Sequence, residues 1–481
     1  MMVRPRMFGI ETEYAFATLD QKGTRRDLGW SLHRLMKVVR ETLPHLPELR
    51  GHGVFLCNGG RFYVDCGHPE LTTPECTSPS EAVRYVLAGH RILRDMATRL
   101  AAESPEIGRV FLGRCHVDYV NGHTWGCHES YLHRCHPEQL PDQIVPHLVS
   151  RILYSGSGGF NNLDPGIEFL LEPRVAHLVK VISGSSTSSR GIYHTRNEAL
   201  CRGFHRLHIL AGASNCCHKA AWLKIGTTAL IVAIIEHGAS PGDPFRLADP
   251  VRALQRIARD PVCQTDLMLS GGKVTSAIEI QRHYLKEVEK RLDRLPEWAP
   301  LVCREWRSVL EALAGSPLSL FKKLDWPLKL ALFKRHVERK GMSWGELNRL
   351  PGQELEALRS ELFLIDTSFS LLLGEGIFEN LERSGVLDHR VPGVDHLDRA
   401  REHPPAATRA WLRGEQIRQL ATTPGVCCGW ESVIDREGQR CLDLSDPFST
   451  VGRWRPLVSG GAEGEDSFLL SRLLRHREQR C

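Results

Sequence analysis

The stretch FGIETEYAF, residues 8–16, constrains the fold of this chain more than any other. Side chains alternate between the two faces of a β-strand, so its bulky apolar residues would share one face and Glu11 and Glu13 the other. Two carboxylates about 7 Å apart on one face repel each other unless a cation lies between them. The stretch is therefore either an ordinary half-buried strand with a solvated acidic face, or a strand that holds a hard divalent cation such as Mg²⁺ or Mn²⁺.

Length and composition narrow the class of protein. At 481 residues the chain is long enough for more than one domain, and its 42% hydrophobic and 25% charged residues are ordinary for a globular protein. The net charge of +5 is small and does not favour nucleic-acid binding. The most apolar run, residues 225–235, is far shorter than the ~20 residues of a membrane span. Fifteen cysteines without a secretion signal indicate free thiols in a reducing cytoplasm. Together with the small net charge and the short apolar run, they predict a cytoplasmic protein that binds neither nucleic acid nor a membrane.

A second acidic feature follows in residues 54–70, VFLCNGGRFYVDCGHPE. This segment predicts two short strands around a tight turn at Asn58-Gly59. In the second strand Tyr63 and Asp65 share one face, and Glu70 follows five residues after Asp65. A polar sheet face that carries carboxylates therefore extends beyond the first strand.

Histidines and arginines supply further candidates for the polar face of the sheet. Cysteines and histidines crowd residues 115–136 without the spacing of a structural zinc site, so we interpret His128 as part of the polar sheet face. Two later strand candidates end in Arg174 and Arg196, where a guanidinium either binds a phosphate or carboxylate or forms a surface salt bridge. The glycine-rich run SGSGG, residues 155–159, lacks a P-loop lysine and is either a phosphate contact or a flexible turn.

Hydrophobic periodicity predicts the helices. It indicates an apolar core helix over 220–237 and amphipathic helices elsewhere, at 31–43, 80–100 (capped by Ser80), 275–295, 306–314 and 326–339. Strands with Glu, His and Arg on one face, interleaved with helices, predict an α+β fold whose curved sheet carries a metal–phosphate site. A boundary at His403-Pro404-Pro405 divides a large catalytic domain, 1–404, from a small C-terminal domain, 405–481.

Several motifs together resemble the Pup ligase and depupylase family: GIETEY, NGGRFYVDCGHPE, GCHESYL, HTRNE, RLHILAGASN and LKIGTTAL. The resemblance covers nearly the whole chain. It implies a glutamine synthetase-like antiparallel sheet packed on helices, with ATP and Mg²⁺ bound on the sheet and the small C-terminal domain closing the nucleotide site. In this family a ligase joins the C-terminal glutamate of the small protein Pup to a lysine through a γ-glutamyl phosphate, and a depupylase cleaves that bond.

The resemblance also implies roles for single residues. Glu11, Glu13 and Glu70 match acidic metal ligands of the family, and Asp65 matches an aspartate that acts as base or activates the attacking group. Nucleotide-site and phosphate-binding positions are matched by Tyr63, His128, Arg196, His208, Arg413 and Trp430.

Differences from the family set the alternatives. Only 39 residues, 15–53, separate ETEY from VFLCNG, which is the length of the ligase rather than of the depupylase with its inserted loop. ASNCCHK places Ala213 and His218 where the family has acids, and IYHTRNEALCR and GRCH also differ. We expect an ATP- and Mg²⁺-dependent ligase that joins a glutamate carboxylate to a lysine amine, with a nucleotide, a Pup-like modifier and its protein targets as partners. The alternatives are a nucleotide phosphohydrolase in which Asp65 activates water, and a depupylase-like amidase.

Overall fold

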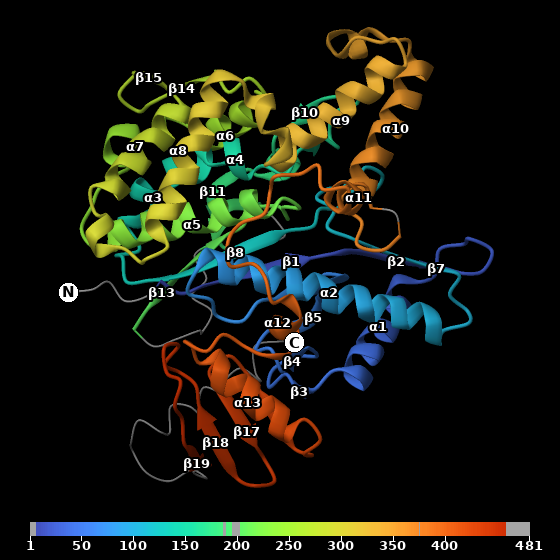
Figure 1. The fold of residues 1–481 in the computed structure, drawn as a ribbon, viewed down its shortest axis with the longest axis vertical. Coiled ribbons are helices and arrows are strands. Elements are labelled where there is room, and N and C mark those ends of the chain that lie inside the picture. The colour runs from blue at the N-terminus through green and yellow to red at the C-terminus, as the bar shows by residue number, and fades with distance from the viewer. Residues whose placement is uncertain (1–5, 186–188, 195–202, 375, 458–481) are drawn as a thin grey trace.

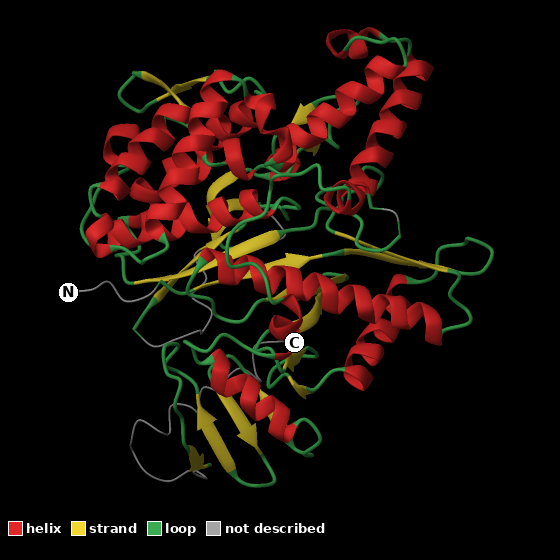
Figure 2. Cartoon of the chain, in the orientation of Figure 1, coloured by secondary structure: helices red, strands yellow, loops and turns green. Residues whose placement is uncertain are grey.

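A sheet of nine strands crosses the middle of the molecule, with helices packed on it and a small C-terminal unit below (Figures 1 and 2). The computed structural model describes residues 6–185, 189–194, 203–374 and 376–457. Within these residues the large sheet is antiparallel except for one outer pair, β11 (Lys180–Ser183) with β12 (Gly191–His194). The predicted α+β class with a large, mostly antiparallel sheet is confirmed.

The strand made from residues 8–13 lies at the centre of this sheet. In spatial order the sheet is β11, β12, β13 (His205–Ile209), β8 (Cys127–His133), β1 (Phe8–Glu13), β6 (His68–Thr72), β5 (Arg61–Asp65), β4 (Val54–Leu56) and β3 (His45–Pro47). Burial alternates along β1, because Phe8 and Ile10 pack in the hydrophobic core while Glu11 and Glu13 stay partly exposed on the other face. The register places Glu11 opposite His128 of β8, and Glu13 opposite Glu70 of β6.

The helix α5 (His218–Glu236) forms the centre of the helical layer. It contacts α2 (Pro79–Glu103), α3 (Leu140–Ser150), α7 (Ala277–Glu289) and α8 (Ala299–Gly315). Among the described residues α5 is the one helix long and apolar enough to cross a membrane, but most of it is buried inside the molecule. Its apolar character on all sides is that of the predicted core helix.

The other elements complete the two layers. Among the described residues the remaining α-helices are α1 (Leu28–Thr42), α4 (Ile152–Ser155), α6 (Pro250–Ala258), α9 (Asp325–Arg339), α10 (Gly352–Phe369), α11 (Ile377–Arg383), α12 (Leu397–Glu402) and α13 (Ala410–Leu420). Three two-stranded sheets pair β2 (Ala15–Leu19) with β7 (Arg109–Gly113), β9 (Gly159–Phe160) with β10 (Phe169–Leu170), and β14 (Asp266–Met268) with β15 (Val274–Ser276). The prediction that Ser80 caps α2 was wrong, because the hydroxyl of Ser78 accepts the N–H of Glu81 and Pro79 occupies the first turn.

The small C-terminal unit consists of α13 and a four-stranded sheet. Its strands are β16 (Val426–Cys428), β17 (Ser432–Asp435), β18 (Arg440–Asp443) and β19 (Trp454–Pro456). A separate hydrophobic cluster joins it to β3 and β4, and a β-bridge links Glu48 to Cys428. The helix α12 packs on α2, and α13 begins at Ala410. The boundary between residues 404 and 405 stays a prediction.

A candidate active site on the open face of the sheet

The open face of the large sheet forms the floor of a cavity of about 1180 Å³. Alternate residues of the central strands supply its polar floor: Glu11, Glu13, Arg61, Tyr63, Asp65, His68, Glu70, His128, Ser130, Arg206 and His208. The helix α1, the loop between β3 and β4, and the small C-terminal unit supply the walls. The cavity is larger than the about 300–1,000 Å³ of ordinary small-molecule sites, so it has room for more than one small ligand.

Glu11, Tyr63 and Glu70 form a proton-sharing group on this floor. The hydroxyl of Tyr63 is within hydrogen-bonding distance of both carboxylates, yet it carries a single proton, so one carboxyl must supply a second proton. Burial and the charge of Glu11 raise the pKa of Glu70 well above its ordinary value. Burial acts in the same direction on Glu11, but the hydrogen bond to His128 and the charge of His208 outweigh it and lower the pKa of Glu11. Of the two carboxyls, Glu70 is therefore the one that more readily keeps a proton, and Glu11 is the one that more readily ionises.

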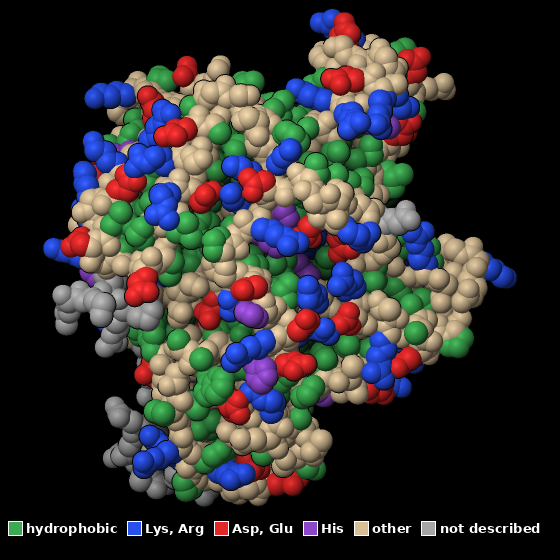
Figure 3. Space-filling view, viewed as in Figure 1, with side chains coloured by type: hydrophobic (Ala, Val, Ile, Leu, Met, Phe, Trp, Pro, Cys, Tyr) green, Lys and Arg blue, Asp and Glu red, His purple; other side chains and the backbone are tan. Residues whose placement is uncertain are grey.

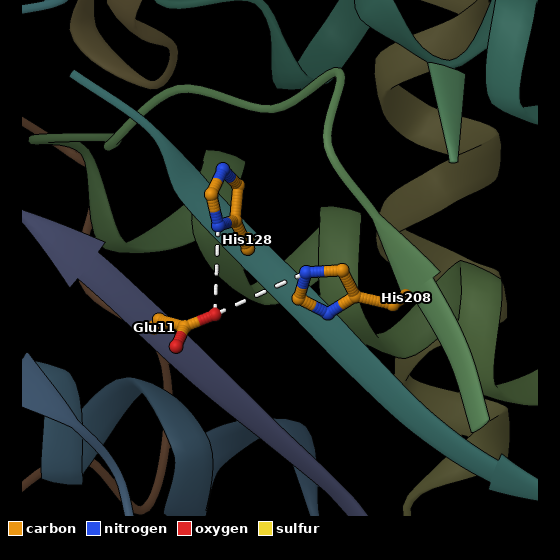
Figure 4. Close-up of side chains that lie close together, drawn as sticks. All are labelled: Glu11, His128 and His208. Carbon is orange, nitrogen blue, oxygen red and sulfur yellow. Dashed lines mark ion pairs between the residues drawn. The ribbon is translucent and has the colours of Figure 1, made fainter. Parts of the chain in front are cut away.

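Two histidines meet the ionised Glu11 from neighbouring strands. Figure 4 shows Glu11, His128 and His208 pointing toward one another. The Oε2 atom of Glu11 is 3.5 Å from Nδ1 of His128 and 4.0 Å from Nε2 of His208. Their possible ligand atoms all lie within 4.8 Å of one another. One carboxylate and two imidazoles are donors that a divalent cation can use.

The end of β1 carries the second carboxylate of the original pair. The carboxylate of Glu13 accepts the N–H of Gly126 at 2.7 Å and lies 3.4 Å from Nδ1 of His68. Burial would raise the pKa of Glu13, but the hydrogen bond to His68 and nearby cations lower it to about 2. Glu13 is therefore ionised at neutral pH, and it faces Glu70 across the strand pair.

Asp65 lies at the tip of the same face, where an incoming group can reach it. The two-residue turn between β5 and β6 has positive φ at both Cys66 (47°) and Gly67 (83°), as a type I′ turn requires. This turn makes Asp65 and His68 a facing pair, and Asp65 is exposed to the cavity.

Arginines line the cavity next to these carboxylates. Arg174, which the sequence left open between an anion contact and a salt bridge, is buried and donates to the carbonyls of Leu210 (3.0 Å) and Gly212. Sequence reasoning missed Arg190, and it also missed Arg61, which lies over the Tyr63 ring at 3.7 Å. The strand alternation that selected Tyr63 and Asp65 also places Arg61 on that face, so this signal was present in the sequence.

The remaining sequence candidates lie in different places. Trp430 lines the cavity from the C-terminal unit, whereas Arg413 is buried beside the cavity and does not line it. Arg196 lies outside the described residues. The SGSGG run is neither a cavity wall nor an open turn, because Gly158 and Gly159 have positive φ and pack closely against Trp326 and Pro173.

Another cluster of metal-ligand residue types, His218, Glu382 and His389, lies outside the cavity. The Nδ1 atom of His389 accepts the backbone N–H of His218 at 3.2 Å, so Nε2 carries the ring proton and faces Glu382 at 3.4 Å. Both ring nitrogens of His389 are thereby engaged. Its Nδ1 atom and its backbone carbonyl, which accepts the N–H of Lys219 at 2.9 Å, cap the start of α5.

Comparisons with known proteins agree along the chain. The sequence model of the family described as "Pup-ligase protein" matches residues 6–434. The Pup–protein ligase of Actinosynnema mirum is 32% identical over 462 residues, which are 93% of this chain and 97% of that protein. The Pup deamidase/depupylase of Mycolicibacterium smegmatis is 34% identical over 401 residues, 80% of this chain and 76% of that protein.

Solved structures extend the likeness to three dimensions. The crystal structure of the complex between the prokaryotic ubiquitin-like protein Pup and its ligase PafA matches with a TM-score of 0.78 and 25% identity, over 98% of this chain and 93% of that chain. The structure of PafA in complex with ADP matches with a TM-score of 0.71 and 26% identity, over 94% of each chain. Since sequence and fold agree from β1 to the C-terminal unit, the chain belongs to the Pup ligase family.

Proposed function

We propose that this protein uses ATP to join the side-chain carboxylate of a glutamate, at the end of a Pup-like small protein, to the amine of a target lysine. The observation that carries this proposal is that one cavity combines Glu11, Glu13 and Glu70 with cationic side chains. The chain spans 97% of a Pup–protein ligase but 76% of a depupylase, which supports ligation over amide cleavage. Described cysteines form no disulfides, which fits the reducing cytoplasm expected from the sequence.

The donor set of the floor fits Mg²⁺ or Mn²⁺. Glu11, Glu13 and Glu70 would hold the cation, because a cation can replace the proton that Glu70 shares with Tyr63 and cancel the repulsion between carboxylates. When bound, it would supply positive charge to the phosphate oxygens of the nucleotide. His128 and His208 would position Glu11 and remain available to the phosphates.

The first step would be phosphoryl transfer to the glutamate. The glutamate carboxylate attacks the γ-phosphorus of ATP, an oxygen–phosphorus bond forms, the bond to the bridging oxygen breaks, and ADP leaves. Arg174 and Arg190 lie at the wall beside Glu13 and would share the charge of the transferred group. Arg196 would add to them, as its match to a phosphate-binding arginine of the family implies. Trp430 would contact the nucleotide from the C-terminal unit.

The second step would form the isopeptide bond. The lysine amine attacks the carbonyl of the acyl phosphate, inorganic phosphate leaves, and the exposed carboxylate of Asp65 takes the amine proton. Asp65 suits this role because it lies at the edge of the floor, beyond the proton-sharing Glu11, Tyr63 and Glu70.

Hydroxylamine trapping tests the acyl phosphate. With ATP, Mg²⁺ and a small protein ending in glutamate, but no target, hydroxylamine should convert the activated donor to a hydroxamate that mass spectrometry detects. Omitting ATP is the control. Formation of ADP and phosphate in the complete mixture without any hydroxamate would contradict the mechanism and favour phosphohydrolysis.

A further inference from the structure

We propose that Arg413 is a positioning residue that, together with Glu75, holds the C-terminal unit on the sheet and orients Trp430 at the nucleotide end of the cavity. The inference deepens the proposed function and rests on it, because it takes Trp430 as a nucleotide contact. It also gives Arg413 a role different from that of a nucleotide ligand.

All N–H groups of the Arg413 guanidinium are already hydrogen-bonded within the protein. It is fully buried, and its Nε and Nη2 atoms donate to the carbonyl of Gly59 at 3.1 and 2.9 Å. Nη1 donates to Oε1 of Glu75 at 3.2 Å and to the carbonyl of Trp430 at 3.5 Å, and Nη2 also donates to Oε2 of Glu75. An arginine has five N–H donors, and these contacts use all five.

The second observation is that Arg413 contacts Trp430 twice. Besides the bond to the Trp430 carbonyl, its guanidinium carbon lies 4.8 Å from the centre of the Trp430 ring and 5.6 Å from that of Phe55. Phe55 meets the Trp430 ring edge-on, with centroids 5.0 Å apart. Trp430 lines the cavity while Arg413 and Phe55 do not, so their contacts with the indole link both residues to the cavity.

The third observation is that one carboxylate of the large domain binds two arginines of the C-terminal unit. Glu75 accepts from Nε of Arg409 at 2.6 Å as well as from Arg413, and Arg409 also donates to the carbonyl of Leu444 at 2.9 Å. Burial would raise the pKa of Glu75, but the two guanidinium groups hold it at about 2, so the ion pair persists at neutral pH. Glu75 and Arg409 both line the cavity themselves, whereas Arg413 lies behind them, and so the ion pairs join the rim to the C-terminal unit.

Arg413→Lys tests the proposal, because lysine keeps the charge and loses the planar fork of donors. The Kd of ADP, measured by calorimetry, should rise about tenfold. The KM of ATP should rise while kcat changes by less than about twofold, since a contact made equally in ground and transition states affects KM alone. The matched control is Arg440→Lys: Arg440 pairs with Asp435 at 2.8 Å and lies 4.7 Å over Trp454 in the same unit, away from the cavity, so the Kd should not change.

A double-mutant cycle with Trp430→Ala separates positioning from direct contact. If Arg413 acts through Trp430, the double variant binds ADP no more weakly than Trp430→Ala alone. Additive losses, or an unchanged Kd in a folded Arg413→Lys variant, would overturn the inference. If Arg413→Lys does not fold, Glu75→Asp replaces it in the double-mutant cycle with Trp430→Ala, because aspartate keeps the charge on a shorter side chain. The expected ADP affinities are the same. A wild-type protein that binds no ADP would instead contradict the proposed function, so the two failures are distinguishable.

Discussion

Replacing Glu70 by Gln should reduce by one the number of protons that the protein releases when it binds a divalent cation. In the structure Tyr63 bonds both Glu11 and Glu70, and the raised pKa of Glu70 means that this carboxyl keeps its proton below that pKa and loses it above. A cation that uses the Glu70 carboxylate must displace this proton. Affinity should therefore rise with pH, by about tenfold for each pH unit below the pKa of Glu70, and should level off above it.

Calorimetric titration with Mn²⁺, from about pH 5 to about pH 8 in buffers of different ionisation enthalpy, measures affinity and proton release together. Near pH 5, at about the lower limit of the range, the wild-type protein should release one proton more per bound cation than Glu70→Gln. The variant should bind Mn²⁺ more weakly at every pH. Asp65→Asn is the control, because it leaves Tyr63, Glu11 and Glu70 in place and should retain the release. If wild type and Glu70→Gln release equal numbers of protons over the whole range, the shared-proton account is wrong.

Two further predictions concern the base and the core. Asp65→Asn should lower turnover by roughly 10²–10⁴-fold with little change in ADP or Mn²⁺ affinity; loss of Mn²⁺ binding would make Asp65 a ligand instead. Glu129→Gln should lower the free energy of unfolding in urea by about 3–5 kcal/mol, because it leaves Arg151 buried without its carboxylate partner at 2.5 and 2.9 Å. Arg99→Ala, which breaks the exposed pair of Arg99 with Glu103, should cost less than about 1 kcal/mol, and similar losses in both variants would contradict this reasoning.

Much of the floor could be predicted from alternation within single strands. The spacing of Glu11 and Glu13 indicated one acidic face of the first strand, and the same rule placed Tyr63 and Asp65 on one face of another strand. All four side chains line the cavity. It would also have selected Arg61. The mixed charge on the surface agrees with the small net charge, since Figure 3 shows both signs interspersed over the visible face.

What could not be predicted is which strands lie side by side and which donors are already used. Glu11 meets His128 and His208 because β8 pairs with both β1 and β13, and these pairings join segments far apart in sequence. Likewise, no sequence pattern reveals that the guanidinium of Arg413 donates its hydrogen bonds to Glu75 and to backbone carbonyls. Such properties depend on tertiary packing rather than on local spacing.

The most direct test of the proposed ligation follows phosphate and conjugate in one reaction. Purified protein is mixed with Mg²⁺, ATP, a small protein ending in glutamate and a lysine-bearing target, and each partner is omitted in turn. We expect one phosphate released per isopeptide conjugate, and little phosphate without the small protein, because a ligase protects its phosphoryl group until the acceptor carboxylate is bound. Rapid multiple-turnover release of phosphate from ATP or AMP with no protein partner would contradict the ligase function and identify a phosphohydrolase.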